Sequence, residues 1–528
     1  MPGDSAPAIA SAVAVGSAFG LYSASDFRLA DGHCRDCPTI RQALWYFENE
    51  TIAVPKARLE VASFASGVSV GDDLRAWLAW REPGAMLEYP PLVWVAAPDV
   101  VAGARLSDDA AALEHAGGRL RLSLVPKITL NRSYFDRSSA VFFRQRSIKV
   151  RGNAAGGAMV ARTLWPEDFR LDRAPPARPL AANRAATEAL RALIRAEPDG
   201  GARSPFDACS LWQREPAREA APPGRAVLGI MVNGAQGDDD EAHAGHFALV
   251  TGRTQPDGAI GDWLVNNFYS LDTESEKGIL AAPVPLDNYL ADLNSGQGWY
   301  RPSHMLVAVL ADERAPALVQ AALNRVYNQF WRHQLVYRHA TMNCASISVD
   351  LLRVLGWDIP ARGPASRSIA ALGFPWFAAR ERSIAKARVA FDYLNEDQTR
   401  LMPAASFEEA GASLLALVAR SGAAPPDGRL ARMLADDVNA IAFLRFPQFP
   451  SSRAYGDAPA VTPWEFHARV PAEPGMMQIV PVPPRPFPEA LRDPDLLPSR
   501  RPPSDYAAVV WGLLLFVGVP LLLYGLWK

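Results

Sequence analysis

The stretch YRHATMNCASISVDLLRVLGW, residues 337–357, combines a polar approach, a single cysteine and a helix-like pattern. From Ile347 onward, apolar residues at positions 351, 352, 354 and 355 have the spacing that buries one helical face. Gly356 supplies a stop signal. Asn343 belongs to the residue types that cap helix N-termini. We therefore predict a helix capped by Asn343, with Cys344 in its first turn.

A cysteine in the first turn of a helix is a candidate nucleophile, because the helix dipole and the free N–H groups lower the pKa of its thiol. Many lone cysteines are instead inert core residues. Catalysis by a thiolate also needs a base and usually a polar residue that orients the base. The assignment of Cys344 as a nucleophile therefore depends on partners elsewhere in the chain.

The candidate base is His246, which opens a predicted strand in GHFALVTG, residues 245–252. The next predicted strand, residues 262–269, contains Asn266 and Asn267. Successive side chains of a strand point to opposite faces, so only one of these asparagines can orient the histidine. We choose Asn267. The alternative for His246 is a structural histidine whose hydrogen bonds are satisfied within a strand.

Together, GHFALVTG, the Asn266-Asn267 pair and the later NCASISVDLL resemble the circularly permuted papain-like cysteine hydrolases, over about residues 225–360. That superfamily includes relatives of the NlpC cell-wall peptidases and the lecithin:retinol acyltransferases. The resemblance implies a papain-like α+β core with Cys344 as nucleophile, His246 as base and an asparagine as orienting residue. The acyltransferase branch has Glu-His after its Asn-Cys, where this chain has Ala-Ser, so the substrate stays open.

At 528 residues the chain is too long for one core, and an apolar content of 49% is typical of folded protein. The expected fold class is α+β multidomain, with an N-terminal antiparallel β domain, a papain-like α+β domain, a helical region and a C-terminal single transmembrane helix. The expected boundaries are 1–30 for a weak signal or disordered N-terminus, 31–151 for the β-rich domain, 152–224 for a connector with one helix, 225–380 for the papain-like domain, 381–470 for the helical region, 471–505 for a Pro-rich tether and 506–527 for the transmembrane helix.

Local patterns give the individual elements. Period-2 alternation and turn residues predict short strands, and period-3.6 apolar spacing predicts helices. The predicted strands include residues 52–54, 92–95, 120–125, 140–143, 226–232 and 304–310. The predicted helices include residues 183–196, 315–338, 384–394, 406–420 and 428–444.

The C-terminal prediction depends on residues 507–523, a run of 17 uncharged and almost wholly apolar residues. That length is close to what a hydrocarbon core requires. Arginines before the run favour a cytoplasmic body, whereas the uncharged apolar stretch at residues 9–22 resembles a weak secretory signal. We therefore expect a single-pass protein of a bacterial inner membrane, with the family resemblance favouring a periplasmic body.

Four cysteines are too few for a disulfide scaffold. The pair Cys34 and Cys37 forms a CxxC that is compatible with a disulfide, half a zinc site or a redox pair, of which a structural disulfide or two plain thiols is favoured. His243 and His246, after an acidic run, offer an alternative metal site. We expect no cofactor and no bound metal.

The predicted function is that of a membrane-anchored cysteine-dependent hydrolase or transferase, with amide or peptide bonds favoured over other acyl groups. It would act through a thioester on Cys344. One alternative is a non-enzymatic, membrane-tethered binding protein with a degenerate papain-like domain, and another is a metal-dependent hydrolase. The formal net charge of −2 argues against a nucleic-acid partner. The sequence does not indicate an oligomeric state.

Overall fold

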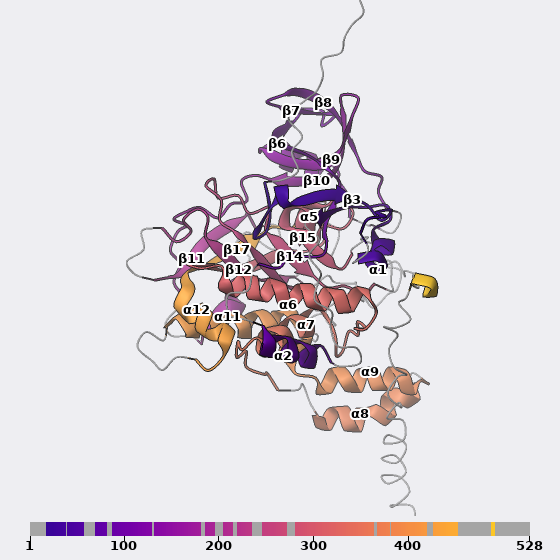
Figure 1. The fold of residues 1–528 in the computed structure, drawn as a ribbon, viewed down its shortest axis with the longest axis vertical. Coiled ribbons are helices and arrows are strands. Elements are labelled where there is room, and N and C mark those ends of the chain that lie inside the picture. Colours follow the sequence, from indigo (N-terminus) through magenta and orange to yellow (C-terminus); the bar gives the residue numbers. More distant parts are fainter. Residues whose placement is uncertain are drawn as a thin grey trace, which may run out of the picture.

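The computed structural model describes residues 17–37, 40–56, 69–81, 87–128, 131, 133–180, 185–195, 204–214, 219–234, 245–271, 280–363, 367–380, 382–419, 426–451 and 487–491. Within these ranges the architecture is α+β. A seven-stranded sheet occupies the centre, a small barrel lies at one end, and a pair of helices projects at the other (Figure 1).

The central sheet is antiparallel throughout. Its spatial order is β11 (Asp207–Gln213), β17 (Val438–Phe446), β16 (Ser303–Leu310), β12 (Ala226–Asn233), β13 (His246–Arg253), β14 (Leu264–Asn267) and β15 (Ala282–Pro285). The middle strands β12 and β16 are buried along their whole length, which explains their almost continuous apolar sequence. The sheet is therefore an interior layer of the molecule.

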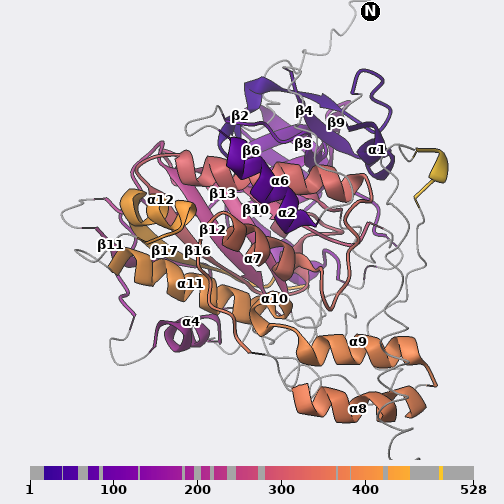
Figure 2. The same cartoon turned by 60° about the horizontal axis from the view of Figure 1, so that its bottom comes forward.

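Three helices cover one face of this sheet: α6 (Arg314–Trp331), α7 (Cys344–Val354) and α11 (Pro403–Ala419) (Figure 2). A short helix, α5 (Leu286–Ala291), contacts strand β14 and the barrel strand β10. Gly411 of α11 illustrates how closely the layers pack, because a Cβ there would lie 2.7 Å from a methyl group of Leu190 on α4 (Ala186–Arg195).

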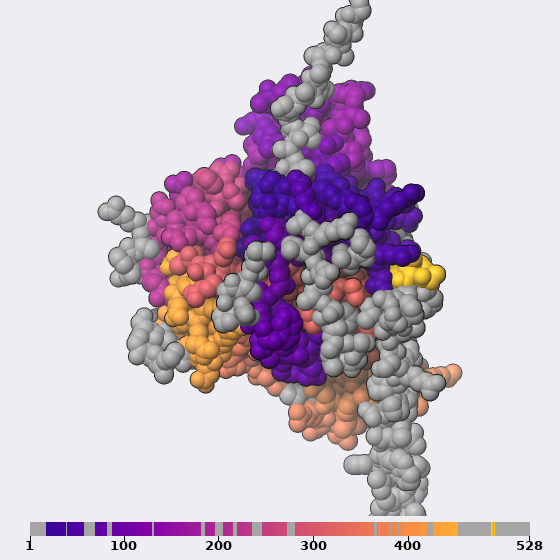
Figure 3. All heavy atoms as spheres, in the orientation of Figure 1, coloured from indigo at the N-terminus to yellow at the C-terminus, as the bar shows by residue number. Residues whose placement is uncertain are grey.

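The barrel consists of β6 (Asp99–Leu106), β7 (Ala112–His115), β8 (Gly118–Leu124), β9 (Ile148–Ala155) and β10 (Ala158–Pro166), closed in the order β10-β8-β7-β6-β9. It forms the upper end of the surface in Figure 3. Beside it, β3 (Phe27–Ala30), β4 (Thr51–Pro55) and β5 (Val93–Ala96) make an antiparallel sheet, and β1 (Ala18–Phe19) pairs with β2 (Tyr22–Ser23). Helix α1 (Arg41–Leu44) belongs to this part, whereas α2 (Val70–Trp80) packs beside α6 and α7 on the central sheet, where its Asp73 pairs with Arg325 of α6 at 2.5 Å.

The predicted antiparallel N-terminal domain requires correction in three respects. Strands β8 and β10 pair in parallel, because the connection through α3 (Arg137–Arg144) and β9 returns the chain to β8 in the same direction. The expected strand at residues 140–143 lies inside α3, whose N-cap Asp136 accepts from two backbone N–H groups. The barrel also continues to residue 166, past the expected boundary at residue 151.

Buried ion pairs join the barrel to α5. Lys149 and Arg151, neighbours on one face of β9, both contact the carboxylate of Asp287, at 2.6 and 3.1 Å. Arg162 on β10 pairs with Asp292, just after α5, at 2.6 Å. Burial raises the pKa of the Asp287 carboxyl, but Arg151 and Lys149 together outweigh it and hold that pKa below its ordinary value. The barrel and the central sheet are thus parts of one packed body.

The C-terminal part is not purely helical. It contains α8 (Arg367–Arg380), α9 (Ile384–Asn395), α10 (Gln398–Leu401), α11 and α12 (Arg429–Asp437), but the predicted helix at 428–444 ends at residue 437. Residues 438–446 form β17, which lies between β11 and β16 in the central sheet. The expected helical region therefore completes the sheet of the preceding domain.

The predicted C-terminal transmembrane helix is not supported. Among the helices of the described ranges, none is both long enough and apolar enough to cross a membrane. The longest, α6, carries Gln320, Asn324 and Arg325 along its length. Residues 506–527, on which the prediction depended, lie outside the described residues, as does the predicted tether at 471–505 apart from residues 487–491.

Candidate active site

The helix that carries Cys344 begins as its sequence predicts. The side chain of Asn343 accepts from the N–H groups of Ala345 and Ser346, both at 2.9 Å, and Ser346 Oγ accepts from the N–H of Asn343 at 2.8 Å. This reciprocal pair is a capping box. The helix ends at Val354, and Gly356 follows the C-cap Leu355 with a φ of +88°, which suits glycine. Cys344 is therefore held at the first position of α7.

The register of the sheet determines which asparagine faces His246. Residues 249 and 266 are opposite each other on β13 and β14, so Asn267 shares a face with His246, and Asn266 lies on the other face. Asn267 makes a side-chain hydrogen bond with His246. Its Nδ2 donates to the carbonyl of Leu280 at 3.1 Å, which fixes the amide. Asn266 instead bonds Gln320 of α6.

Further polar residues lie beside His246, at the ends of the neighbouring strands β12 and β16. In register, Asn233 of β12 lies between His246 and Ser303 of β16. Asn233 Nδ2 donates to Ser303 Oγ at 2.6 Å, and its Oδ1 accepts from the hydroxyl of Tyr289. The Tyr289 ring centroid is 6.5 Å from that of His246. One end of three neighbouring strands thus presents a connected polar cluster.

Cys344 borders this cluster. Its sulfur accepts from the main-chain N–H of Phe247, the residue after His246, and from the hydroxyl of Tyr337. Within the described ranges no hydrogen bond joins the thiol to the imidazole directly, and Nε2 of His246 is buried without a hydrogen-bond partner. The thiol and the histidine are therefore near neighbours through Phe247, and both are more than nine-tenths buried.

Burial controls the charge of both groups. Desolvation raises the pKa of the Cys344 thiol, and the donors Phe247 and Tyr337 offset this only in part. The pKa expected from the helix position alone was lower, so burial is the stronger effect. Desolvation and the nearby Arg301 lower the pKa of His246 to about 3. The thiol and the imidazole are both neutral at pH 7, and the imidazole can act as a base.

Arg301 is the cation of this site. It is 1% exposed, and its Nε donates to Gln297 Oε1 at 2.8 Å, within the turn η4 (Gln297–Trp299) and its flank. Its positive charge favours the ionised forms of Cys344 and Tyr289 and disfavours protonation of His246. Burial lowers the pKa of Arg301 itself to about 10, so it stays charged at neutral pH.

Sequence reasoning identified Cys344, His246 and Asn267, and the fold brings all three into one region. It did not identify Arg301, Tyr289, Tyr337 or Tyr393 of α9, although the charge of Cys344 acts on Tyr393 as well. Tyr337 opens the stretch 337–357, but nothing in its local pattern marks it as a site residue. The other three come from segments with no motif, so only the tertiary arrangement reveals them.

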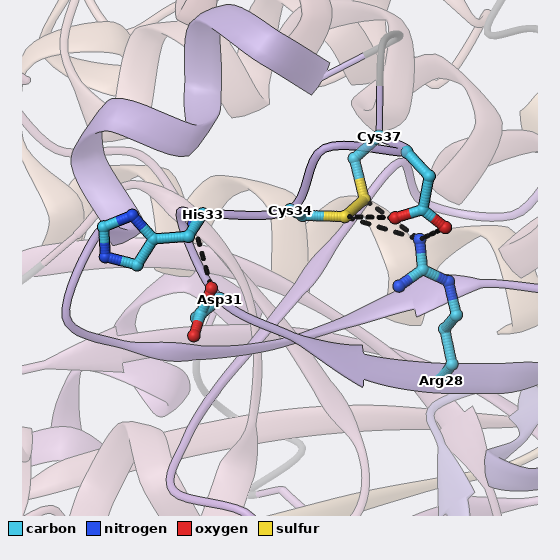
Figure 4. Close-up of a disulfide and its surroundings, with 6 residues drawn as sticks. Arg28, Asp31, His33, Cys34 and Cys37 are labelled. Carbon is cyan, nitrogen blue, oxygen red and sulfur yellow. Dashed lines mark hydrogen bonds and ion pairs between the residues drawn. A yellow bond between two sulfur atoms is a disulfide. The ribbon is translucent and has the colours of Figure 1, made fainter.

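The remaining candidates lie elsewhere. His243, the alternative metal ligand, lies outside the described residues. Cys34 and Cys37 form a disulfide, and the Arg28 guanidinium donates to both sulfur atoms (Figure 4). His33 points away from this pair in the same view. With Asp36, the two cysteines are the only group with metal-ligand spacing in the described ranges, and as a disulfide they offer no thiolate.

Comparisons of the chain with protein-family models, with curated proteins and with solved structures found no match. Any assignment of class therefore depends on the geometry of the site and on the short motifs in the sequence.

Proposed function

We propose that the protein is a cysteine-dependent hydrolase or transferase of papain-like type that cleaves an acyl bond, with amide or peptide substrates favoured. His246 removes the proton from Cys344 as the sulfur attacks the carbonyl carbon. A carbon–sulfur bond forms, the carbon–nitrogen bond breaks, and the proton passes to the leaving amine. Water or an acceptor amine then attacks the thioester, and the released thiolate regains a proton through His246.

The observation that carries this proposal is the contact of the Cys344 sulfur with the N–H of Phe247, next to a His246 that Asn267 orients. These are the nucleophile, base and orienting residue that thioester chemistry requires. The resemblance of the three sequence motifs to circularly permuted papain-like hydrolases agrees with these roles. Since both groups start neutral, proton transfer accompanies the attack rather than preceding it.

The proposal is tested with p-nitrophenyl acetate and the full chain. Wild-type protein should release a burst of p-nitrophenol and carry an acetyl group on Cys344, identified by peptide mass spectrometry. Cys344→Ala should abolish the burst, and His246→Ala should slow it by about 10²-fold or more. Cys209→Ala is the matched control, because Cys209 is the other free cysteine and is buried in β11. A burst retained in Cys344→Ala would refute the proposal.

A second candidate function is a non-enzymatic binding protein with a degenerate papain-like domain. The burial of Cys344, with its raised thiol pKa, favours this alternative, because buried structural cysteines are unreactive. Under it, His246→Ala leaves the rate of iodoacetamide labelling at Cys344 unchanged. A lower rate in that variant, with unchanged thermal stability, favours the enzyme.

A further inference from the structure

The helices α8 and α9 form a projecting hairpin, residues 367–395, that packs mainly on itself (Figures 1 and 2). Ala370 and Ala387 are buried between the two helices, and the rings of Phe374 and Phe391 meet edge to face at 6.0 Å. The hairpin stands at the end of the molecule opposite the barrel. Its outer surface is therefore available to a partner.

The outer face of α8 is apolar. Ala371, Leu372, Pro375, Trp376 and Ala379 share this face at helical spacing and are all exposed, and we call them the apolar stripe. Leu372 is 79% exposed and Trp376 is 55% exposed. With Ile384 at the start of α9, the hairpin carries three of the six large apolar side chains that are exposed among the described residues. Such a concentration marks an interaction surface.

The charge around the stripe indicates the kind of partner. Residues 367–395 contain five Lys or Arg and two Asp or Glu, whereas the whole chain has a formal net charge of −2. The five cations, all exposed, are Arg367, Arg380, Arg382, Lys386 and Arg388. The Arg380 guanidinium lies 5.1 Å from the centre of the Trp376 ring, so a cation directly borders the stripe. A partner that matches this face is apolar inside and anionic outside.

An anionic lipid bilayer has that profile. Tryptophan and arginine are suited to the headgroup region, where an apolar ring or stem is buried while a polar end contacts phosphate. A helix that is apolar on its outer face and flanked by cations lies in the plane of such an interface. We propose that the hairpin docks on an anionic membrane surface, with the apolar stripe of α8 entering the headgroup region and the flanking arginines on lipid phosphates.

The test is co-sedimentation of the full chain with vesicles of phosphatidylcholine alone and with vesicles containing about 30% phosphatidylglycerol. The wild type should bind the anionic vesicles more strongly, and binding should weaken as salt is raised. Leu372→Ser with Trp376→Ser should lower the partition coefficient by about tenfold or more, through the loss of apolar burial. Arg380→Glu with Arg382→Glu should remove the preference for anionic lipid.

Trp80→Ser is the matched control, because Trp80 is 65% exposed on α2, outside the hairpin. It should leave vesicle binding unchanged. Equal partitioning of the wild type and the stripe variant would overturn the proposal, whichever other segment then binds the vesicles. A concentration-dependent dimer without lipid, lost in the stripe variant, would also overturn it by assigning the stripe to a second copy of the chain.

Discussion

The side chain of Asn267 hydrogen-bonds the imidazole of His246 from the neighbouring strand, whereas Asn266, one residue earlier, bonds Gln320 on the opposite face of the sheet. Adjacent residues of the same type therefore have different tasks. One is placed to orient the candidate base, and the other stabilises the contact between the sheet and α6.

Substitution of each asparagine should separate these tasks. Asn267→Ala should slow the p-nitrophenyl acetate burst, because the imidazole loses its orienting partner, and should cost about 1 kcal/mol of stability through the bond lost to the Leu280 carbonyl. Asn266→Ala should lower the free energy of unfolding by about 1–3 kcal/mol, because a buried Gln320 loses two hydrogen bonds. Burst kinetics and urea unfolding of both variants measure the two effects. The reverse pattern would contradict the assignment of Asn267.

Arg301 should set the pH at which Cys344 reacts. Its charge lowers the pKa of the thiol, so Arg301→Gln should move the iodoacetamide rate profile of Cys344 to higher pH. Arg301→Lys keeps a cation and should move it less. Tyr289, Tyr337 and Tyr393 also interact with the thiol and are unchanged in both variants. Superimposable profiles for the wild type and Arg301→Gln would exclude this electrostatic role.

Two buried histidines should make the fold sensitive to acid. Burial lowers the pKa of His246 and of His304 to about 3, whereas an unfolded histidine has its ordinary pKa near 6.5. Below that pH the unfolded chain binds protons that the native state does not. The contribution of the two neutral histidines to the free energy of unfolding is therefore complete above about pH 6.5. It is lost as the pH falls toward 3, at about 1.4 kcal/mol per pH unit for each histidine.

His304→Leu should reduce this slope by the share of one proton, since His304 stacks on Phe443 with no hydrogen-bond partner for either ring nitrogen in the described ranges. Urea unfolding at several pH values between about 4 and 6 measures the slope. His33→Asn, at an exposed position, is the control. An unchanged slope in His304→Leu would show that His304 gains its proton without unfolding.

The cysteine pairing predicts a thiol count. Cys34 and Cys37 are joined, and Cys209 and Cys344 are free. Ellman's reagent should therefore detect two thiols in unreduced protein under denaturing conditions, and four after reduction. Cys34→Ser should raise the unreduced count by one, because Cys37 then becomes free. Four thiols in the unreduced wild type would contradict the disulfide.

Local signals in the sequence were sufficient for several parts of this structure. The N-cap Asn343, the apolar spacing of α7 and the stop at Gly356 act within a few residues, so they predicted a helix that the structure contains. The alternating pattern after His246 likewise predicted β13 and the faces of its side chains. Predictions from such short-range interactions need no information about distant segments of the chain.

Other features depend on tertiary contacts that single-sequence patterns do not encode. The segment at 140–143 has strand-like residues, but the cap at Asp136 and burial of Phe143 make it a helix. The choice between Asn266 and Asn267 needed the register of β14 against β13. The pKa of Cys344 depended on how deeply α7 is buried, which its own sequence does not state. Arg301 joined the site only through the fold.

The position of β17 has a consequence for biosynthesis. This strand is formed by residues 438–446, yet it lies inside the sheet between β11 and β16, which precede it by more than a hundred residues. A nascent chain that has emerged only as far as α7 leaves both of those strands with an open edge. The sheet that supports His246 is completed only when residue 446 has left the ribosome, so this sheet cannot finish folding during synthesis until β17 has emerged.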